Sequence, residues 1–124
     1  YSQWLGIESV EHRGGYCRIK MQVREEMLNG FGIVHGGVTF GLADSCLAFA
    51  ANSYNVLSVT LDGFISYPNP GKLNDILFAE TKENSSNKKT ATYDVEVTNQ
   101  DGIKIALMRA TVYKTRKNVL DLEI

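Results

Sequence analysis

The sequence predicts an α+β fold in which a curved antiparallel sheet wraps around one long central helix. Three observations support this prediction: an apolar segment of helical length, several alternating segments typical of half-buried strands, and short polar turns between the later strands. The chain has 124 residues, close to the commonest size of one domain. We therefore expect residues 1–124 to form a single domain around one core.

The helix is predicted from Gly37 to Asn52. This segment has no β-branched run and is apolar nearly all round, so we expect other parts of the chain to cover most of its sides. Asp44 is the only charged residue in the segment. A charge is seldom fully buried without a partner, because its desolvation costs several kcal/mol. Asp44 is therefore the first candidate for a functional residue.

Strands are predicted on both sides of the helix. Residues 15–23 alternate between apolar and polar side chains, as a half-buried strand does. Four further strands follow the helix and are predicted to form an antiparallel meander. The first spans residues 57–67 with a bulge at Gly63, and the last, residues 103–113, is apolar enough to be a central strand. The intervening strands are predicted at residues 75–82 and 91–98, with a polar connection at residues 83–88, while His12 is assigned to a surface loop.

Charge and composition narrow the class of protein. The net charge is −1, from 13 basic and 14 acidic residues, which argues against a nucleic-acid binder. No secretory signal is visible, and the apolar helix is shorter than the ~20 residues of a membrane span. These features predict a soluble, cytoplasmic protein without a membrane partner. Cys17 and Cys46 lie among apolar neighbours, so we expect reduced thiols in the core.

Polar and small residues gather immediately before the predicted helix. Asn29, His35 and the pair Gly36-Gly37 lie there. A helix N-terminus has unpaired N–H groups and partial positive charge, so it can polarise a carbonyl and stabilise the oxyanion formed on attack. Simpler structural roles are open for each residue: the glycines could form a turn, His35 could cap the helix, and Asn29 could begin a turn.

The spacing between Gly36 and Asp44 has a mechanical consequence. Eight residues of helix span roughly 12 Å at ~1.5 Å per residue, whereas an attacking group must lie within ~3–3.5 Å of the reacting carbon. One chain's Asp44 therefore cannot easily act on a carbonyl bound at its own Gly36. If both residues act, they should come from different subunits of a two-fold dimer.

These residues resemble the signature of the hotdog-fold acyl-CoA thioesterases, specifically their phenylacetate-pathway, PaaI-like branch. The resemblance covers about residues 15–114. It is carried by the residues Asn29-Gly30, Gly32, His35-Gly36-Gly37, Phe40, Leu42-Ala43-Asp44, and then Val59-Thr60-Leu61-Asp62 and Tyr67-Pro68-Asn69-Pro70-Gly71.

The resemblance implies a reaction and a role for each matching residue. Asp44 would act as general base or as nucleophile toward the thioester, and the Gly36 N–H would bind the thioester oxygen. Asn29 and His35 would position the carbonyl or the leaving group, and Thr60 would support the attacking water. It also implies homodimers that join into homotetramers as dimers of dimers.

The substrate implied is an acyl-CoA, so coenzyme A is part of the substrate and no separate cofactor is expected. Gly37 and Phe40 are candidate substrate contacts. Lys72 and Arg116 are candidate partners of the CoA phosphates, although for each of them the sequence favours a solvated surface charge. No Cys/His cluster has the spacing of a metal site, and no Gly-x-Ser-x-Gly elbow is present.

Two other functions are compatible with the same fold. One is a non-catalytic protein that binds or senses acyl-CoA, which loss of the acid would favour; Asp44 is present. The other is a hotdog hydratase or dehydratase, which would need a different arrangement of histidine and acid. The acyl group, which is small, medium-sized or aromatic in the preferred interpretation, does not follow from the sequence.

Overall fold

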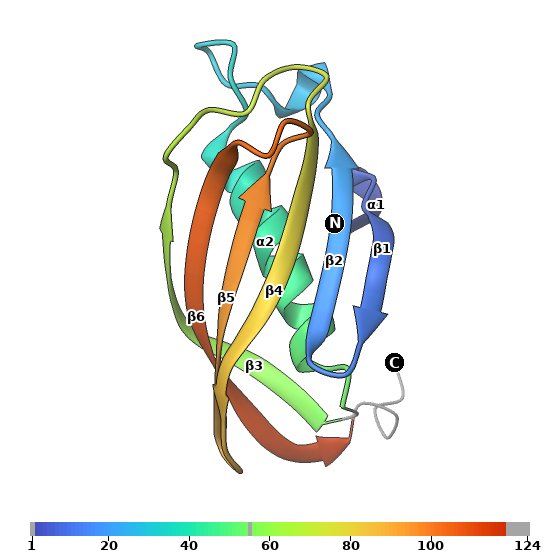
Figure 1. Cartoon of the computed structure of the whole chain (residues 1–124), viewed down its shortest axis with the longest axis vertical. Helices are drawn as coiled ribbons and strands as arrows, with labels where there is room; N and C mark the ends of the chain where they lie inside the picture. The colour runs from blue at the N-terminus through green and yellow to red at the C-terminus, as the bar shows by residue number, and fades with distance from the viewer. Residues whose placement is uncertain (1, 55, 119–124) are drawn as a thin grey trace.

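The computed structural model describes residues 2–54 and 56–118 (Figure 1). Six strands form one antiparallel sheet, and a long helix lies against one of its faces. In chain order the elements are α1 (Ser2–Leu5), β1 (Glu8–Arg13), β2 (Tyr16–Gln22), the short 3-10 helix η1 (Glu25–Met27), α2 (Gly36–Ala51), β3 (Val56–Ser66), β4 (Ile76–Ser86), β5 (Thr90–Thr98) and β6 (Lys104–Asn118).

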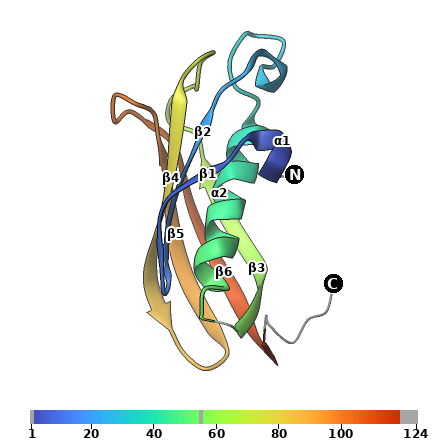
Figure 2. The same ribbon diagram turned by 90° about the vertical axis from the view of Figure 1, so that its right-hand side faces the viewer.

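The strands lie in the order β1-β2-β4-β5-β6-β3, so β1 and β3 are the two edges of the sheet. Figure 2 shows the sheet edge-on, with α2 along its inner face and α1 beside the first half of α2. The predicted α+β class is confirmed. The predicted four-strand meander is wrong in one respect, because only β4, β5 and β6 follow one another in space. Helix α2 carries the chain from β2 to the far edge, so β3 pairs with β6 rather than with β4.

The predicted helix is confirmed to within one residue at each end. The expectation that other parts of the chain cover most of its sides is met only in part. The sheet-facing side is fully buried, with Leu42, Cys46 and Leu47 each 0% exposed. Phe40 and Phe49 flank the opposite side, half a turn apart, and remain about two-fifths exposed. An apolar helix needs cover on most sides, and among the described residues the sheet and α1 cover only part of α2.

Three strand predictions need correction. β1 lies where a surface loop was expected, because all six of its residues are exposed and show no apolar alternation. In β3 the register shifts between Thr60 and Asp62, so the bulge lies at Leu61, whereas Gly63 pairs regularly with Ala110. β4 continues through the expected polar connection to Ser86, because its far end pairs with β5 although its side chains are polar.

The core lies between α2 and the inner face of the sheet. The alternation predicted for β5 is confirmed, since its inward residues Ala91, Tyr93, Val95 and Val97 are at most 1% exposed. Both cysteines are free and buried, as expected. The Cys46 thiol lies 3.3 Å from the carbonyl oxygens of Cys17 and Ala79, which fixes α2 against β2 and β4.

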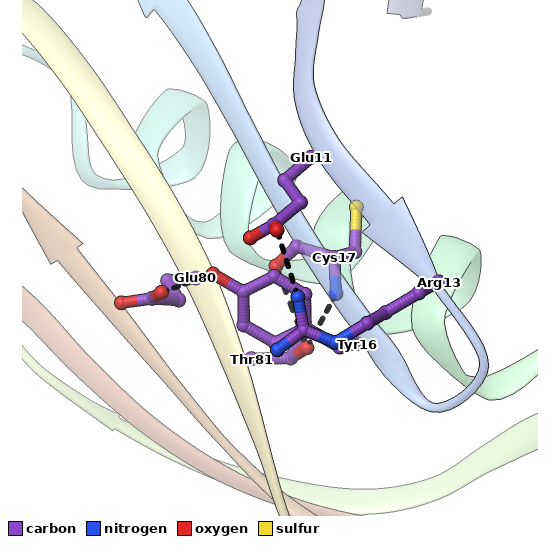
Figure 3. A network of polar contacts seen from close by, with 6 residues as sticks. All are labelled: Glu11, Arg13, Tyr16, Cys17, Glu80 and Thr81. Carbon is purple, nitrogen blue, oxygen red and sulfur yellow. Dashed lines mark hydrogen bonds and ion pairs between the residues drawn. The ribbon is translucent and has the colours of Figure 1, made fainter.

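A polar network covers the outer face near the β1 edge (Figure 3). The Arg13 guanidinium forms an ion pair with Glu11 at 2.8 Å and lies 4.0 Å from the centre of the Tyr16 ring. The Tyr16 hydroxyl donates a hydrogen bond to Glu80. Burial and this hydrogen bond raise the pKa of Tyr16 to about 12. The phenol therefore stays protonated and links β2 to β4.

Candidate active site

The N-terminus of α2 is built from the predicted His-Gly-Gly sequence. His35 is the N-cap residue, and its Nδ1 accepts a hydrogen bond from the Gly37 N–H at 2.9 Å. The His35 carbonyl accepts from the N–H groups of Val38 and Thr39. Among the described residues, no acceptor is paired with the Gly36 N–H. This donor lies where the helix dipole is positive, which makes it suited to binding an anionic oxygen.

The loop before the helix is held by Asn29. Its Oδ1 accepts from the N–H groups of Phe31 at 2.9 Å and Ile33 at 3.4 Å. The simpler roles considered for Asn29 and His35 are therefore real: one residue closes a turn and the other caps the helix. Neither role uses the Asn29 Nδ2 or the His35 Nε2, so both side chains keep a polar atom for a ligand.

A cavity of about 420 Å³ adjoins this helix start. Asn29 and Gly36 both line it, so the structure brings these two predicted residues together. Its other wall is the loop that follows β3, including Tyr67 and Gly71. Sequence reasoning did not assign Tyr67 a role at this site. Its place beside Pro68 at the end of a predicted strand could not reveal a contact with a residue 31 positions earlier.

Asp44 lies apart from this cavity, on the uncovered side of α2. It follows Phe40 by one turn and precedes Ala48 by one turn, and both of these residues are exposed. No hydrogen bond or ion pair joins its carboxylate to another described residue. Burial raises the pKa of Asp44 above the ordinary range of an aspartate. A raised pKa brings a carboxylate closer to the strength of a useful base near neutral pH.

Three further predicted site residues, Thr60, Phe40 and Gly37, do not line this cavity. Thr60 is exposed on β3, opposite Val112 of β6. Phe40 lies on the same uncovered side of α2 as Asp44. The Gly37 N–H is occupied by His35, so Gly37 can offer a ligand only its lack of a side chain.

The two predicted CoA-phosphate partners are less defined. Lys72 is exposed directly after the cavity-lining Gly71, and its backbone N–H donates to Asp75 at 2.9 Å. Arg116 belongs to β6, but its side chain lies outside the described part of the chain. In the same part, no group of His, Cys, Asp or Glu residues is arranged to hold a metal ion. The described helices include none that is long and apolar enough to cross a membrane.

Together these features define a class of site. A helix N-terminus offers a free N–H for a developing oxyanion, a cavity beside it can hold a carbonyl substrate, and a half-buried carboxylate lies on the same helix. Such a set serves acyl transfer to water, in which an activated water or a carboxylate attacks a carbonyl carbon.

Comparison with known proteins gives the same class. The sequence model of the thioesterase superfamily matches residues 31–106. The acyl-coenzyme A thioesterase PaaI of Escherichia coli is 34% identical over 110 residues, covering 89% of this chain and 79% of that protein. Its solved structure superimposes with a TM-score of 0.92 over 94% of this chain and 85% of that chain, at 32% identity.

A Streptococcus mutans protein, solved bound to acetyl CoA, is also similar. It has a TM-score of 0.87 and 30% identity and covers 90% of each chain. The chain belongs to the thioesterase superfamily, with the hotdog fold of its PaaI-like members. The predicted family, fold and enzyme class, a thioester hydrolase, are confirmed.

Proposed function

We propose that this chain hydrolyses small, medium-sized or aromatic acyl-CoA thioesters to the free acid and coenzyme A. The observation that carries the proposal is the Gly36 N–H at the start of α2, which is paired with no acceptor among residues 2–54 and 56–118 and lies beside a cavity. The similar Streptococcus mutans protein bound to acetyl CoA supports an acyl-CoA ligand. Coenzyme A enters as part of the substrate, so the proposal includes no separate cofactor.

In the proposed reaction, the thioester oxygen accepts a hydrogen bond from the Gly36 N–H. Attack on the carbonyl carbon places negative charge on this oxygen, and the helix N-terminus stabilises that charge more strongly in the transition state than in the substrate. Collapse of the tetrahedral intermediate breaks the carbon–sulfur bond. The thiolate is a good leaving group, so the reaction needs no strong general acid.

Asp44 is proposed as the general base that takes a proton from water, or as the nucleophile that attacks the carbonyl directly. The two roles differ in whether a covalent anhydride forms. Thr60 is proposed to support the attacking water. Asn29 and His35 are proposed to orient the carbonyl or the sulfur through the polar atoms left free by their structural bonds.

The site is proposed to be shared between two copies of the chain. Asp44 and Gly36 lie eight residues apart on one helix, roughly 12 Å, which is too far for both to act on one carbonyl. The free edge of β3 and the uncovered side of α2 support pairing with a second copy. Such a dimer, joined into a dimer of dimers, would place Asp44 of one copy near Gly36 of the other.

Around the reacting atoms, Gly37 and Phe40 are proposed to contact the substrate, and Lys72 and Arg116 to bind the CoA phosphates. The buried free thiols of Cys17 and Cys46 support a reducing compartment, and we place the enzyme in the cytoplasm.

The test is thiol release from a panel of acyl-CoAs by wild type and by Asp44→Asn, which keeps the size of the side chain and removes the charge. Loss of a general base should lower kcat by about 10²- to 10⁴-fold. Asp101→Asn, in the exposed β5–β6 turn, is the matched control and should leave kcat unchanged. A wild type that binds acyl-CoA without releasing thiol would establish the non-catalytic binding function instead.

The pH dependence of activity gives a second test of the role proposed for Asp44. A base must be ionised to act, and burial raises the pKa of Asp44. Activity should therefore fall with decreasing pH through a range above the ordinary aspartate pKa of about 3.9. An acid limb at or below that ordinary value would remove Asp44 from the role of base.

A further inference from the structure

We propose that Tyr67 is a positioning residue that holds the Gly36 segment in the geometry needed to bind the oxyanion. Its hydroxyl donates a hydrogen bond to the Gly36 carbonyl oxygen at 3.0 Å. This inference rests on the proposed function, because the oxyanion is that of the thioester reaction. It adds a residue that the loop after β3 brings to the site from outside the helix.

The need for such a residue follows from the glycine itself. Glycine has more backbone freedom than any other residue, so an N–H at a glycine is poorly oriented unless its neighbours fix it. The peptide after Gly36 is fixed at both ends. The Gly37 N–H donates to His35 Nδ1 at 2.9 Å, and the carbonyl of Gly36 accepts from Tyr67 at 3.0 Å. The peptide before Gly36 is fixed through the His35 carbonyl, which accepts from Val38.

The Tyr67 ring also packs against Gly36. A Cβ added to Gly36 would lie 3.4 Å from the Tyr67 Cζ and 3.5 Å from its hydroxyl oxygen. Gly36 lies in the helix, where its backbone conformation does not by itself require glycine. A Cβ at these distances is in ordinary van der Waals contact, so the Tyr67 ring packs directly against position 36 without excluding a small side chain. The ring and the glycine form one packed unit.

Tyr67 is itself held by an anchored loop. The Val34 N–H donates to the Gly71 carbonyl at 2.9 Å, and a Cβ on Gly71 would lie 2.9 Å from the Val34 Cγ2. On the other side, the Asn69 Nδ2 donates to the Lys104 carbonyl at 2.8 Å. Burial raises the pKa of Tyr67, so its hydroxyl keeps its proton throughout the neutral range and remains a donor.

A positioning role predicts a specific kinetic signature. The oriented Gly36 N–H matters most when charge develops on the oxygen, so its loss should act on kcat rather than on KM. The hydroxyl contributes one hydrogen bond to a neutral carbonyl, which corresponds to about fivefold in kcat. A residue that only lined the acyl pocket would instead change KM or the preference among acyl groups.

The test compares Tyr67→Phe, which deletes only the hydroxyl, with Tyr113→Phe on the outer face of β6 as the matched control. Thiol release should show a fivefold lower kcat at nearly unchanged KM for Tyr67→Phe, and wild-type values for Tyr113→Phe. The acid limb set by Asp44 should stay in place. An unchanged kcat, or a change confined to KM, overturns the positioning role.

A readout independent of activity separates this inference from the proposed function. In ¹⁵N-labelled protein, Tyr67→Phe should shift the Gly36 and Gly37 amide signals and speed hydrogen exchange at the start of α2, while the core of α2 is unaffected. Unchanged amide signals overturn the contact. Shifted signals in a protein whose wild type releases no thiol from any acyl-CoA would uphold the contact and overturn both the proposed function and the catalytic consequence of Tyr67.

Discussion

The two edges of the sheet are chemically different, although both leave backbone groups without a neighbouring strand. The β1 edge carries charged residues in exposed ion pairs, Glu8 with Lys20 at 3.6 Å and Glu11 with Arg13 at 2.8 Å. The β3 edge carries exposed apolar residues instead, with Leu61 at 58% and Phe64 at 84% exposure. Charges on an edge strand oppose pairing with another chain, whereas an apolar edge invites it.

The helix shows the same asymmetry as the sheet. α1 packs against α2, and its Leu5 is fully buried. Phe40 and Ala48, one turn before and one turn after Asp44, are exposed, so this stripe of α2 is the one that α1 and the sheet leave uncovered. This difference supports the proposal that the β3 edge and the neighbouring side of α2 pair with a second copy of the chain, whereas the β1 edge does not. Under the proposed function, the side that pairs is also where the active site is completed.

The largest effect is expected when a charge is placed on each edge of the sheet by substituting one of two similarly exposed valines. Val59 on β3 is 46% exposed and Val10 on β1 is 44% exposed. Val59→Lys should block pairing at the β3 edge and lower the mass measured by light scattering. It should also lower activity per chain by at least about 10²-fold, because a chain without its β3 neighbour lacks half of the site. Val10→Lys should change neither quantity. Equal behaviour of the two variants would contradict the assignment of the edges.

A smaller effect is expected when one acid of each region is replaced, Asp44 on α2 and Glu11 on β1, and thermal stability is measured as a function of pH. Burial raises the folded-state pKa of Asp44 above its unfolded value, so the folded state binds more protons between these two values. Stability contributed by this group is then present at low pH and lost as pH rises through the folded-state pKa. Asp44→Asn should therefore raise the thermal midpoint at neutral pH, and this gain should disappear near pH 3.

Glu11→Gln is the control for this measurement. Glu11 takes part in an exposed ion pair, and such pairs contribute about 0–1 kcal/mol. Its replacement should give no gain in thermal midpoint at neutral pH. A gain for Asp44→Asn that persisted unchanged at low pH would show that the carboxylate charge is not its cause.

The parts of the fold that sequence predicted are those with a clear apolar period or a run of helix-forming residues. α2 and β5 have such patterns, and both were located nearly to the residue. β1 was missed because an exposed edge strand has no buried face to impose alternation. The position of β3 beside β6 was missed because periodicity identifies strands and not their order, which depends on where the connecting helix delivers the chain.

The residues of the candidate site also fall into those that local sequence predicted and those that it missed. Asn29 and Gly36 were predicted from local chain sequence, and the structure places both at one cavity because only a short loop separates them. Tyr67 was missed as a partner of Gly36 because their contact forms only when the loop after β3 folds over the helix start. The distance between Gly36 and Asp44 is set by helix geometry alone, so its consequence follows from their eight-residue spacing in the sequence.

The backbone conformation at the start of α2 allows variants that remove or keep the Gly36 N–H. Gly36 is the first helical residue, a position that tolerates proline, and His35 has φ −61° and ψ 132°, which suits a residue before proline. Gly36→Pro therefore deletes the N–H with little cost to the helix. Gly36→Ala adds the same contact with Tyr67 but keeps the N–H, so it should retain most of the kcat that Gly36→Pro loses.

The most direct test of a site shared between two chains is the activity of hybrids made by refolding Asp44→Asn and Gly36→Pro chains together. Each parent should be nearly inactive. Random pairing makes half of the dimers hybrids, and each hybrid has one site with Asp44 from one chain and Gly36 from the other, so the mixture should recover about a quarter of wild-type activity. A mixture no more active than its parents would contradict the shared site, because it would mean that Asp44 and Gly36 of the same chain act together.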